Sequence, residues 1–282
     1  MDTETLKPLL ETYAYNILGS YEDARDVVQD VWLKLLENPV NHVENRRGYL
    51  IKSVVNHAIN VKNRQKKFLK EYPGAWLPEP VATEKADTSL EHREILSYSL
   101  MVLMEKLTAR ERAVFILKEA YHYSHREIAD TLDISEENSR QLFRRSKGRL
   151  DKGGAQTSIP DNPKLEQLFV AMQNREMEQL EALLHEDIAI TSDGGGKVSA
   201  AMKSILGIDH VVKFLVGVYR KFYEKVPDLK IVPSQINHQP ALLYYSGGTV
   251  TNCLLFSVKG EKIDQIYFVR NPDKLKNLQK NR

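Results

Sequence analysis

The sequence predicts a multidomain protein in which two all-helical units are followed by one α+β unit. Apolar residues recur every three to four positions up to about Lys70, and again between Thr88 and Gly153. This is the period of amphipathic helices. Strand-like runs appear only beyond Pro160. With 282 residues, the chain is long enough for each of these units to bury a core of its own.

The composition excludes several classes of protein. Cys253 is the single cysteine, so an intramolecular disulfide and a multi-cysteine zinc site are both excluded. No basic stretch with an apolar signal core stands at the N-terminus, and no apolar run approaches the roughly 20 residues that span a bilayer. We therefore expect a cytoplasmic protein without a cofactor or metal. The net charge of +2 is too small to predict nucleic-acid binding, so the positions of the basic residues must decide it.

The first unit, residues 1–70, is predicted to contain two main helices. One begins near Ser20, whose hydroxyl can cap the first turn, and ends by Asn38-Pro39, because proline restricts the residue before it. The other begins at about Gly48 and becomes strongly basic towards Lys70. Residues 71–87 contain several prolines and a glycine, which predicts an extended linker.

The second helical unit, residues 88–153, is predicted from a series of helix caps. Capping boxes stand at Thr88–Glu91, Thr108–Glu111 and Ser124–Glu127. The first box predicts a continuous helix that reaches Leu107. Ser135 is the expected N-cap of a last helix that ends at about Leu150.

The segment from Ser124 to Leu150 is predicted to form a helix-turn-helix, with the turn at Asp133-Ile134. Such a motif places its second helix in the major groove of DNA. We expect its N-terminal residues to face base edges and its later cations to contact phosphates. A helical hairpin with a solvated basic face is the alternative. The candidate DNA-binding residues are Ser124, Glu136, Glu137, Ser139, Arg140, Arg144, Arg145 and Lys147.

Two helical segments resemble a known family. Leu107–Phe115 (LTARERAVF) and Ser124–Ala129 (SHREIA) look like region 4 of sigma-70-type RNA polymerase sigma factors, and Tyr21–Trp32 (YEDARDVVQDVW) resembles region 2. The resemblance implies that region 4 reads the minus-thirty-five promoter element and that region 2 docks on core RNA polymerase. The helix that carries Tyr21–Trp32 also has an acidic surface suited to a basic protein partner. An acidic face that is only solvated would look the same. The implied polymerase contacts are Asp23, Asp26, Asp30 and Trp32.

The basic helix of the first unit carries amides beside cations on one face, a combination that suits nucleic acid. Its candidate DNA-binding residues are Lys52, Asn56, Asn60, Asn63 and Arg64; Lys62 lies alongside them. The family resemblance implies that this region melts the minus-ten element and captures a flipped base. Asn56 is then the expected pocket residue, helped by the loop from His42 to Arg47.

The third unit, residues 160–282, is predicted to hold helices at 165–184 and 208–223. Strands are expected at 229–232, 241–245, 249–258 and 262–269, in an antiparallel sheet. Three segments resemble signatures of extracytoplasmic-function sigma factors fused to a SnoaL-like domain, which implies a cone-shaped α+β fold. They are Trp76-Leu77-Pro78-Glu79-Pro80, Asp193-Gly194-Gly195-Gly196-Lys197 and Asn271-Pro272-Asp273-Lys274-Leu275.

Our hypothesis is that these three segments meet, so that the third unit sets the spacing of the two DNA-binding units. Trp76, in a segment stiffened by prolines, suits insertion between domains, although packing within one domain would also account for it. The glycine run lacks the hydroxyl residue and the earlier glycine of a P-loop, which favours a flexible turn over a phosphate site.

Two other functions are kept open. SnoaL-like folds include cyclases that use an acidic residue or a histidine as a base in an apolar pocket. The candidate catalytic residues here are His185, Asp187, Asp209, His210 and His238, but their spacing identifies no catalytic pair. Binding of a small-molecule ligand in that pocket is therefore favoured over catalysis. A helix-turn-helix regulator that binds operators without core polymerase is the second alternative. It would not need both the acidic helix and the asparagine-bearing helix of region 2.

Overall fold

The computed structural model describes residues 6–37, 44–83, 90–151, 167–168, 170–172 and 174–279. It separates into two compact units. The first comprises Met1–Lys70, Ala86–Leu96 and Leu100–Ala155, and the second comprises Glu71–Lys85, Ser97–Ser99 and Gln156–Arg282. The predicted fold class, helical parts followed by an α+β part, is confirmed. Both helical parts fall in one unit and the linker falls in the other; the three-domain division remains a prediction.

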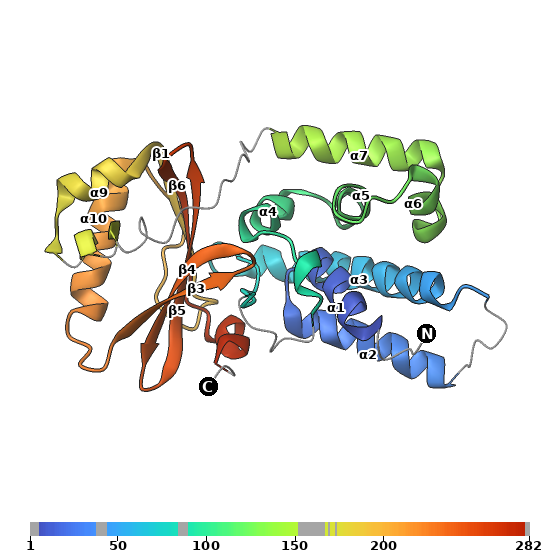
Figure 1. The fold of residues 1–282 in the computed structure, drawn as a ribbon, viewed down its shortest axis with the longest axis horizontal. Coiled ribbons are helices and arrows are strands. Elements are labelled where there is room, and N and C mark those ends of the chain that lie inside the picture. Colours follow the sequence, from blue (N-terminus) through green and yellow to red (C-terminus); the bar gives the residue numbers. More distant parts are fainter. Residues whose placement is uncertain are drawn as a thin grey trace. The chain divides into compact units, whose positions relative to one another are not determined.

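The first helical part consists of α1 (Lys7–Leu18), α2 (Tyr21–Glu37) and α3 (Arg46–Glu71), shown in Figure 1. The hydroxyl of Ser20 accepts a hydrogen bond from the Asp23 amide at 3.2 Å, so the predicted cap of α2 is confirmed. α3 starts two residues before the predicted Gly48, because the Asn45 side chain accepts from the Gly48 amide at 2.9 Å. The predicted stop of α2 at Asn38-Pro39 lies outside the described residues.

The second helical part is less continuous than the sequence predicts. It comprises a 3-10 turn (His92–Glu94), α4 (Tyr98–Leu103), a second 3-10 turn (Met104–Lys106), α5 (Ala109–Glu119), α6 (His125–Leu132) and α7 (Glu136–Asp151). The prediction of one helix up to Leu107 is wrong.

The helix predicted up to Leu107 is broken because side chains of α1 form hydrogen bonds with backbone groups of this segment. The amide of Glu91 donates to the Thr12 hydroxyl at 2.8 Å. The Asn16 side chain accepts from the Leu96 amide at 3.2 Å and donates to the Glu94 carbonyl at 2.7 Å. The Leu96 amide and the Glu94 carbonyl are then not free for bonds along a helix. Thr88, where the helix was expected to begin, lies outside the described residues.

The later caps of this part are confirmed. Thr108 and Ser124 each form a complete capping box with Glu111 and Glu127, respectively. The Asn138 amide donates to the Ser135 hydroxyl at 3.1 Å. Between α6 and α7 the chain reverses at Asp133, which adopts the left-handed conformation with φ of 52°. α6, the turn and α7 therefore form the predicted helix-turn-helix.

A buried cluster of charges stabilises the first unit. The Lys62 ammonium lies 2.9 Å from a Glu105 carboxylate oxygen and donates to the Leu18 carbonyl at 2.8 Å. Arg112, which is fully buried, pairs with the same carboxylate and donates through Nε to the Asn16 carbonyl at 2.9 Å. Lys62, expected among the exposed cations of the basic helix, is therefore a buried structural residue.

The second unit is built on one six-stranded sheet with the order β2-β1-β6-β5-β4-β3. Its strands are β1 (Leu184–Asp193), β2 (Ile205–Leu206), β3 (Lys230–Ile236), β4 (Gln239–Ser246), β5 (Thr249–Lys259) and β6 (Lys262–Val269). Helices α9 (Met177–Leu183) and α10 (Ile208–Val218) pack beside the sheet (Figure 1), and α10 continues as a π-helical turn, Tyr219–Tyr223. The chain closes with a 3-10 helix, Pro272–Leu278.

Two expectations for this unit need correction. The sheet is mixed and not purely antiparallel, because β1 pairs with β6 in the parallel sense; the long connection between these strands makes that possible. The helical pattern predicted over 165–184 is interrupted at Arg175, where φ is 60°, and it ends at Leu183, because the strand β1 begins at Leu184. In the described part of the chain, no helix has the length and apolar character needed to cross a membrane.

Candidate functional site

The N-terminal turn of α7 presents only some of the residues expected to face DNA bases. Glu137 and Arg140 are exposed, and Glu136 pairs with Arg140 at 3.0 Å. Ser139 is fully buried and its hydroxyl lies 2.9 Å from Nδ1 of His125. The structure therefore places Ser139 inside the motif and not on its base-facing surface. Burial and the nearby Lys118 and Arg140 lower the pKa of His125, which favours its neutral ring.

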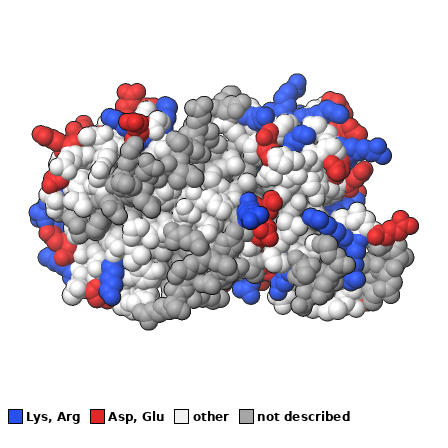
Figure 2. All heavy atoms as spheres, viewed as in Figure 1, with Lys and Arg blue, Asp and Glu red and all other residues white. Residues whose placement is uncertain are grey.

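The remaining candidates of the helix-turn-helix differ in exposure. Arg144 and Arg145 are exposed on α7. Lys147 is also exposed but pairs with Glu119 at 2.9 Å, while Ser124 uses its hydroxyl to cap α6. On the face seen in Figure 2, basic side chains over α7 are interspersed with acidic ones. The face of α7 seen in this view therefore carries charges of both signs.

The candidate DNA-binding face of α3 is only partly open. Asn60, Asn63 and Arg64 are exposed, whereas Lys52 and Asn56 are half-buried. Lys52 donates to the Asp130 carbonyl at 2.9 Å and pairs with Asp133 at 2.5 Å. Asn56 donates to the Thr131 carbonyl at 2.7 Å. Of the loop expected to assist Asn56, residues 42 and 43 lie outside the described part, and 44–47 are exposed.

The acidic surface predicted on α2 is present. Asp26 and Asp30 are exposed, and Asp30 accepts from or pairs with the His57 ring at 3.0 Å. Asp23 accepts from the Gln65 side chain at 2.8 Å, and Trp32 is half-buried. Two exposed leucines on the same helix were not predicted: Leu33 and Leu36 are 52% and 73% exposed. Their apolar surface next to carboxylates is typical of a protein-binding face.

The second unit contains a buried carboxylate on which the linker converges. Asp193 is fully buried at the end of β1. It accepts hydrogen bonds from the Tyr72 hydroxyl at 2.6 Å and the Leu77 amide at 2.9 Å. The Lys274 ammonium lies 2.6 Å from the same carboxylate. Two linker residues and one residue near the C-terminus thus share a single anion, which we call the Asp193 anchor.

Lys274 adds further contacts to the linker. Its ammonium donates to the Leu77 carbonyl and lies 4.0 Å from the centre of the Trp76 ring, a cation–π contact. Burial and the hydrogen bond to Asp193 raise the pKa of the Tyr72 hydroxyl, so this group remains a donor. Further along, the Asn277 side chain donates to the Glu79 carboxylate.

The glycine run lets the three signature segments approach closely. At Gly195, φ is 61° and an added Cβ would stand 2.3 Å from the Asn271 side-chain nitrogen. At Gly196, φ is 70° and an added Cβ would stand 2.7 Å from Pro73. Any other residue would be strained in this conformation and would clash. The run is therefore a tight structural turn, and Lys197 at its end pairs with Asp273 on the surface.

The linker also extends the sheet. The Thr83 amide donates to the Gln235 carbonyl at 2.9 Å, and Ala82 forms an antiparallel bridge with Ile236. The Asn237 side chain accepts from the Val81 amide at 3.0 Å. These bonds cover β3, an edge strand whose backbone groups would otherwise lie open. The linker is buried from Leu77 to Pro80, where it runs from the Asp193 anchor towards β3.

Three partners in this site were not predicted. Tyr72, Asn237 and Gln239 lie outside the recognised segments, and Gln239 accepts from the Ser99 amide at 2.7 Å. The only sequence signal available was Asn237-His238 between two strand-like runs. Both residues have positive φ, as a two-residue hairpin turn requires. The turn could have been found from this pattern, but not its contact with the linker.

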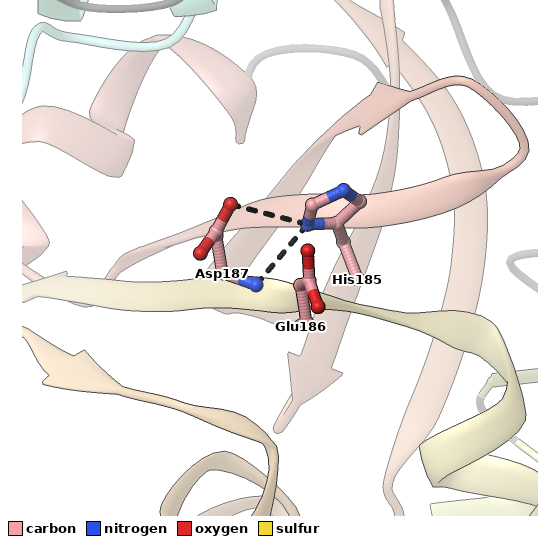
Figure 3. Close-up of side chains that lie close together, drawn as sticks. All are labelled: His185, Glu186 and Asp187. Carbon is pink, nitrogen blue, oxygen red and sulfur yellow. Dashed lines mark hydrogen bonds and ion pairs between the residues drawn. The ribbon is translucent and has the colours of Figure 1, made fainter.

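The residues named for possible catalysis do not form a recognisable catalytic arrangement. Figure 3 shows His185, Glu186 and Asp187 side by side at the start of β1, with the Asp187 amide 3.1 Å from Nδ1 of His185. Glu186 and Asp187 are exposed, and Lys259 lies 3.6 Å from Asp187. Donor atoms of the three residues lie within 4.8 Å of one another, but exposed acidic neighbours are common on protein surfaces. Asp209 and His210 are also exposed.

Comparison with known proteins places these surfaces in context. The family model "Sigma-70 region 2" matches residues 3–68, and the model "Sigma-70, region 4" matches residues 97–150. The chain is 27% identical to "ECF RNA polymerase sigma factor SigJ" of Mycobacterium tuberculosis (strain ATCC 25618 / H37Rv), over 96% of this chain and 91% of that protein. It is 22% identical to "Probable ECF RNA polymerase sigma factor SigI" of M. tuberculosis (strain CDC 1551 / Oshkosh), over 93% and 89%.

A solved structure agrees over the same span. The crystal structure of the M. tuberculosis extracytoplasmic function sigma factor SigJ matches with a TM-score of 0.80 at 25% identity, covering 97% of each chain. The similarity therefore includes both helical parts, the linker and the α+β unit.

Proposed function

The chain belongs to the extracytoplasmic-function group of sigma-70-type RNA polymerase sigma factors, and from this premise we propose that it brings core polymerase to promoters under the control of its own second unit. The likeness to a sigma factor over both helical parts and the α+β unit carries this proposal. The chain would act in the cytoplasm as a non-catalytic subunit. An operator-binding regulator would not account for the region 2 part.

Each proposed partner would bind one of the described surfaces. Exposed Arg140, Arg144 and Arg145 on α7 supply charges for phosphates or guanine edges at the minus-thirty-five element. The face of α3 supplies amides and cations for the melted minus-ten element. The carboxylates of α2, with exposed Leu33 and Leu36, supply a surface for core polymerase.

The proposed control acts through the linker. Residues 72–83 are held along the second unit by the Asp193 anchor at one end and by β3 at the other. Released and fully extended, these twelve residues would span about 40 Å. Holding or releasing the segment therefore changes the largest distance by which regions 2 and 4 can be separated. The two regions must contact promoter elements at a fixed separation.

The sigma function is tested by transcription in vitro from a library of randomised promoters with bacterial core polymerase. We expect transcripts that depend on both the chain and core, from templates enriched in two separate sequence blocks. Replacing Arg144 and Arg145 with glutamine should weaken selection of the upstream block by about 1–3 kcal/mol for each arginine that reads a base.

The matched control is Arg175→Gln in the second unit, where an exposed arginine pairs with Glu224. It should leave both blocks unchanged. Failure of the unaltered chain to bind core, or enrichment of one palindromic block without core, would favour the operator-binding regulator.

A small-molecule ligand is a second candidate role of the α+β unit, and one observation favours it. Tyr223, on the π-helical turn, is 6% exposed, and its hydroxyl has no hydrogen-bond partner among the described residues. Burial raises the pKa of this hydroxyl to about 12, so it is a neutral donor at neutral pH. Its ring lies 5.0 Å from the ring of Tyr244. A buried donor beside aromatic rings suits a planar ligand that carries an acceptor oxygen.

Acetophenone and ethylbenzene form a matched pair of probes, because only the ketone can accept a hydrogen bond. We expect acetophenone to raise the melting temperature of the full chain more than ethylbenzene does, and Tyr223→Phe to abolish the difference. Equal shifts from both probes in the unaltered chain would contradict ligand recognition by this hydroxyl.

A further inference from the structure

Two residues predicted to contact promoter DNA use their side chains for hydrogen bonds within the first unit. On α3, Lys52 and Asn56 together donate to three acceptors at the end of α6: the carbonyls of Asp130 and Thr131 and the carboxylate of Asp133. The distances are 2.9, 2.7 and 2.5 Å, respectively. These are the cation and the amide that would otherwise meet a phosphate and a base.

The acceptors reproduce the chemistry of a nucleic-acid strand. The Asp133 carboxylate is an anion like a phosphate, and the Thr131 carbonyl is a neutral acceptor like the carbonyl oxygen of a base. Both stand at the C-terminal end of α6, where the helix dipole adds partial negative charge. A cation beside an amide on α3 therefore meets an anion beside a carbonyl on the helix-turn-helix.

We propose that the end of α6 and its turn, Asp130–Asp133, occupy the DNA-binding face of α3 as an internal substitute for the promoter strand. The inference rests on the proposed function, since it takes Lys52 and Asn56 as DNA contacts. In this closed arrangement, Lys52 and Asn56 are not available to the minus-ten element. Opening frees them, and it also frees the turn that precedes the base-facing residues of α7.

The contact is of a kind that DNA can displace. The side chains of Lys52 and Asp133 are 39% and 72% exposed, so the pair is partly solvated and contributes modestly to the closed state. A strand of phosphates competes for Lys52 directly. Removing the carboxylate should therefore shift the balance towards the open arrangement by a small but measurable factor.

The turn offers a conservative substitution and a matched control. Asp133→Asn removes the charge, and asparagine accepts the left-handed conformation found at this position. Asp130→Asn makes the same change of net charge one turn away, where Lys52 contacts only the backbone carbonyl. The Asp130 side chain is exposed, so both variants should remain folded, as circular dichroism would verify.

The measurement is the affinity of the full chain for fluorescein-labelled single-stranded DNA, a 20-mer of mixed sequence, at low ionic strength. We expect Asp133→Asn to bind about two- to fivefold more tightly than Asp130→Asn, and the difference to shrink in high salt. Lys52→Met in the Asp133→Asn background should remove the gain.

Equal affinities for Asp133→Asn and Asp130→Asn would overturn the proposal that Asp130–Asp133 take the place of the promoter strand on α3. The sigma assignment is judged separately, by core-dependent transcription of the unaltered chain. Transcription with equal affinities refutes only the internal contact. Absence of transcription refutes only the proposed function, because the DNA-binding comparison does not require core polymerase.

Discussion

Replacing Asp193 with alanine is expected to lower the free energy of unfolding of the second unit by about 3–5 kcal/mol. The carboxylate is fully buried, and its removal leaves the Lys274 ammonium in a largely buried place without its counterion. The Tyr72 hydroxyl and the Leu77 amide lose their acceptor as well. Urea unfolding followed by circular dichroism and tryptophan fluorescence measures the loss.

Asp273→Ala is the matched control. Asp273 is also an aspartate that pairs with lysines, Lys197 and Lys276, but all three side chains are about half exposed, 43% for Asp273 and 55% for each lysine. A pair of this kind contributes about 0–1 kcal/mol. Similar losses from Asp193→Ala and Asp273→Ala would contradict a dominant role for the Asp193 anchor.

Glu105→Gln is expected to destabilise the first unit by about 3 kcal/mol, since it removes the carboxylate charge that the buried Arg112 and Lys62 share. Burial alone would raise the pKa of the Glu105 carboxyl, but Arg112 and Lys62 hold this pKa below its usual value. A lowered pKa in the folded protein means that the stabilisation is complete above the unfolded value of about 4.3. It is lost as the pH falls below that value and through the folded pKa.

Urea unfolding between pH 3 and pH 7 measures both effects. The gap between the unaltered chain and Glu105→Gln should be widest near neutrality and should narrow below about pH 4. Glu119→Gln is the control, because the exposed Glu119–Lys147 pair leaves no buried charge behind. A gap that stays constant across this range would show that the Glu105 charge does not stabilise the unit.

The features that the sequence predicts well are local. The caps at Ser20, Thr108, Ser124 and Ser135 depend on residues three positions apart, and all are present. The same holds for the period of α10, which predicts the helix beginning at Ile208.

The features that were missed depend on residues far apart in the sequence. The helix expected to reach Leu107 breaks because Thr12 and Asn16 of α1 bond to its backbone. Lys62 resembles its exposed neighbours in sequence, yet it is buried, because Glu105 and the Leu18 carbonyl stand opposite it. No pattern within either segment carries that information.

The Asp193 anchor could be predicted from the sequence only in part. The signature segments could be recognised by resemblance, and the structure brings Trp76, Leu77, Asp193, Gly195, Asn271 and Lys274 together in the second unit. Tyr72 could not be predicted, because its role depends on the position of the Asp193 carboxylate. The regulatory role of these residues remains a prediction.

The most direct test of control through the linker is the transcription yield of Asp193→Ala and Asp273→Ala with core polymerase on the promoter library. If the anchor couples the second unit to promoter use, the yield of Asp193→Ala should differ from that of the unaltered chain by about fivefold or more. Asp273→Ala should match the unaltered chain, and all three should bind core equally. Equal yields from all three chains, with Asp193→Ala shown to have released residues 72–83 to proteolysis, would contradict control of promoter use through the linker.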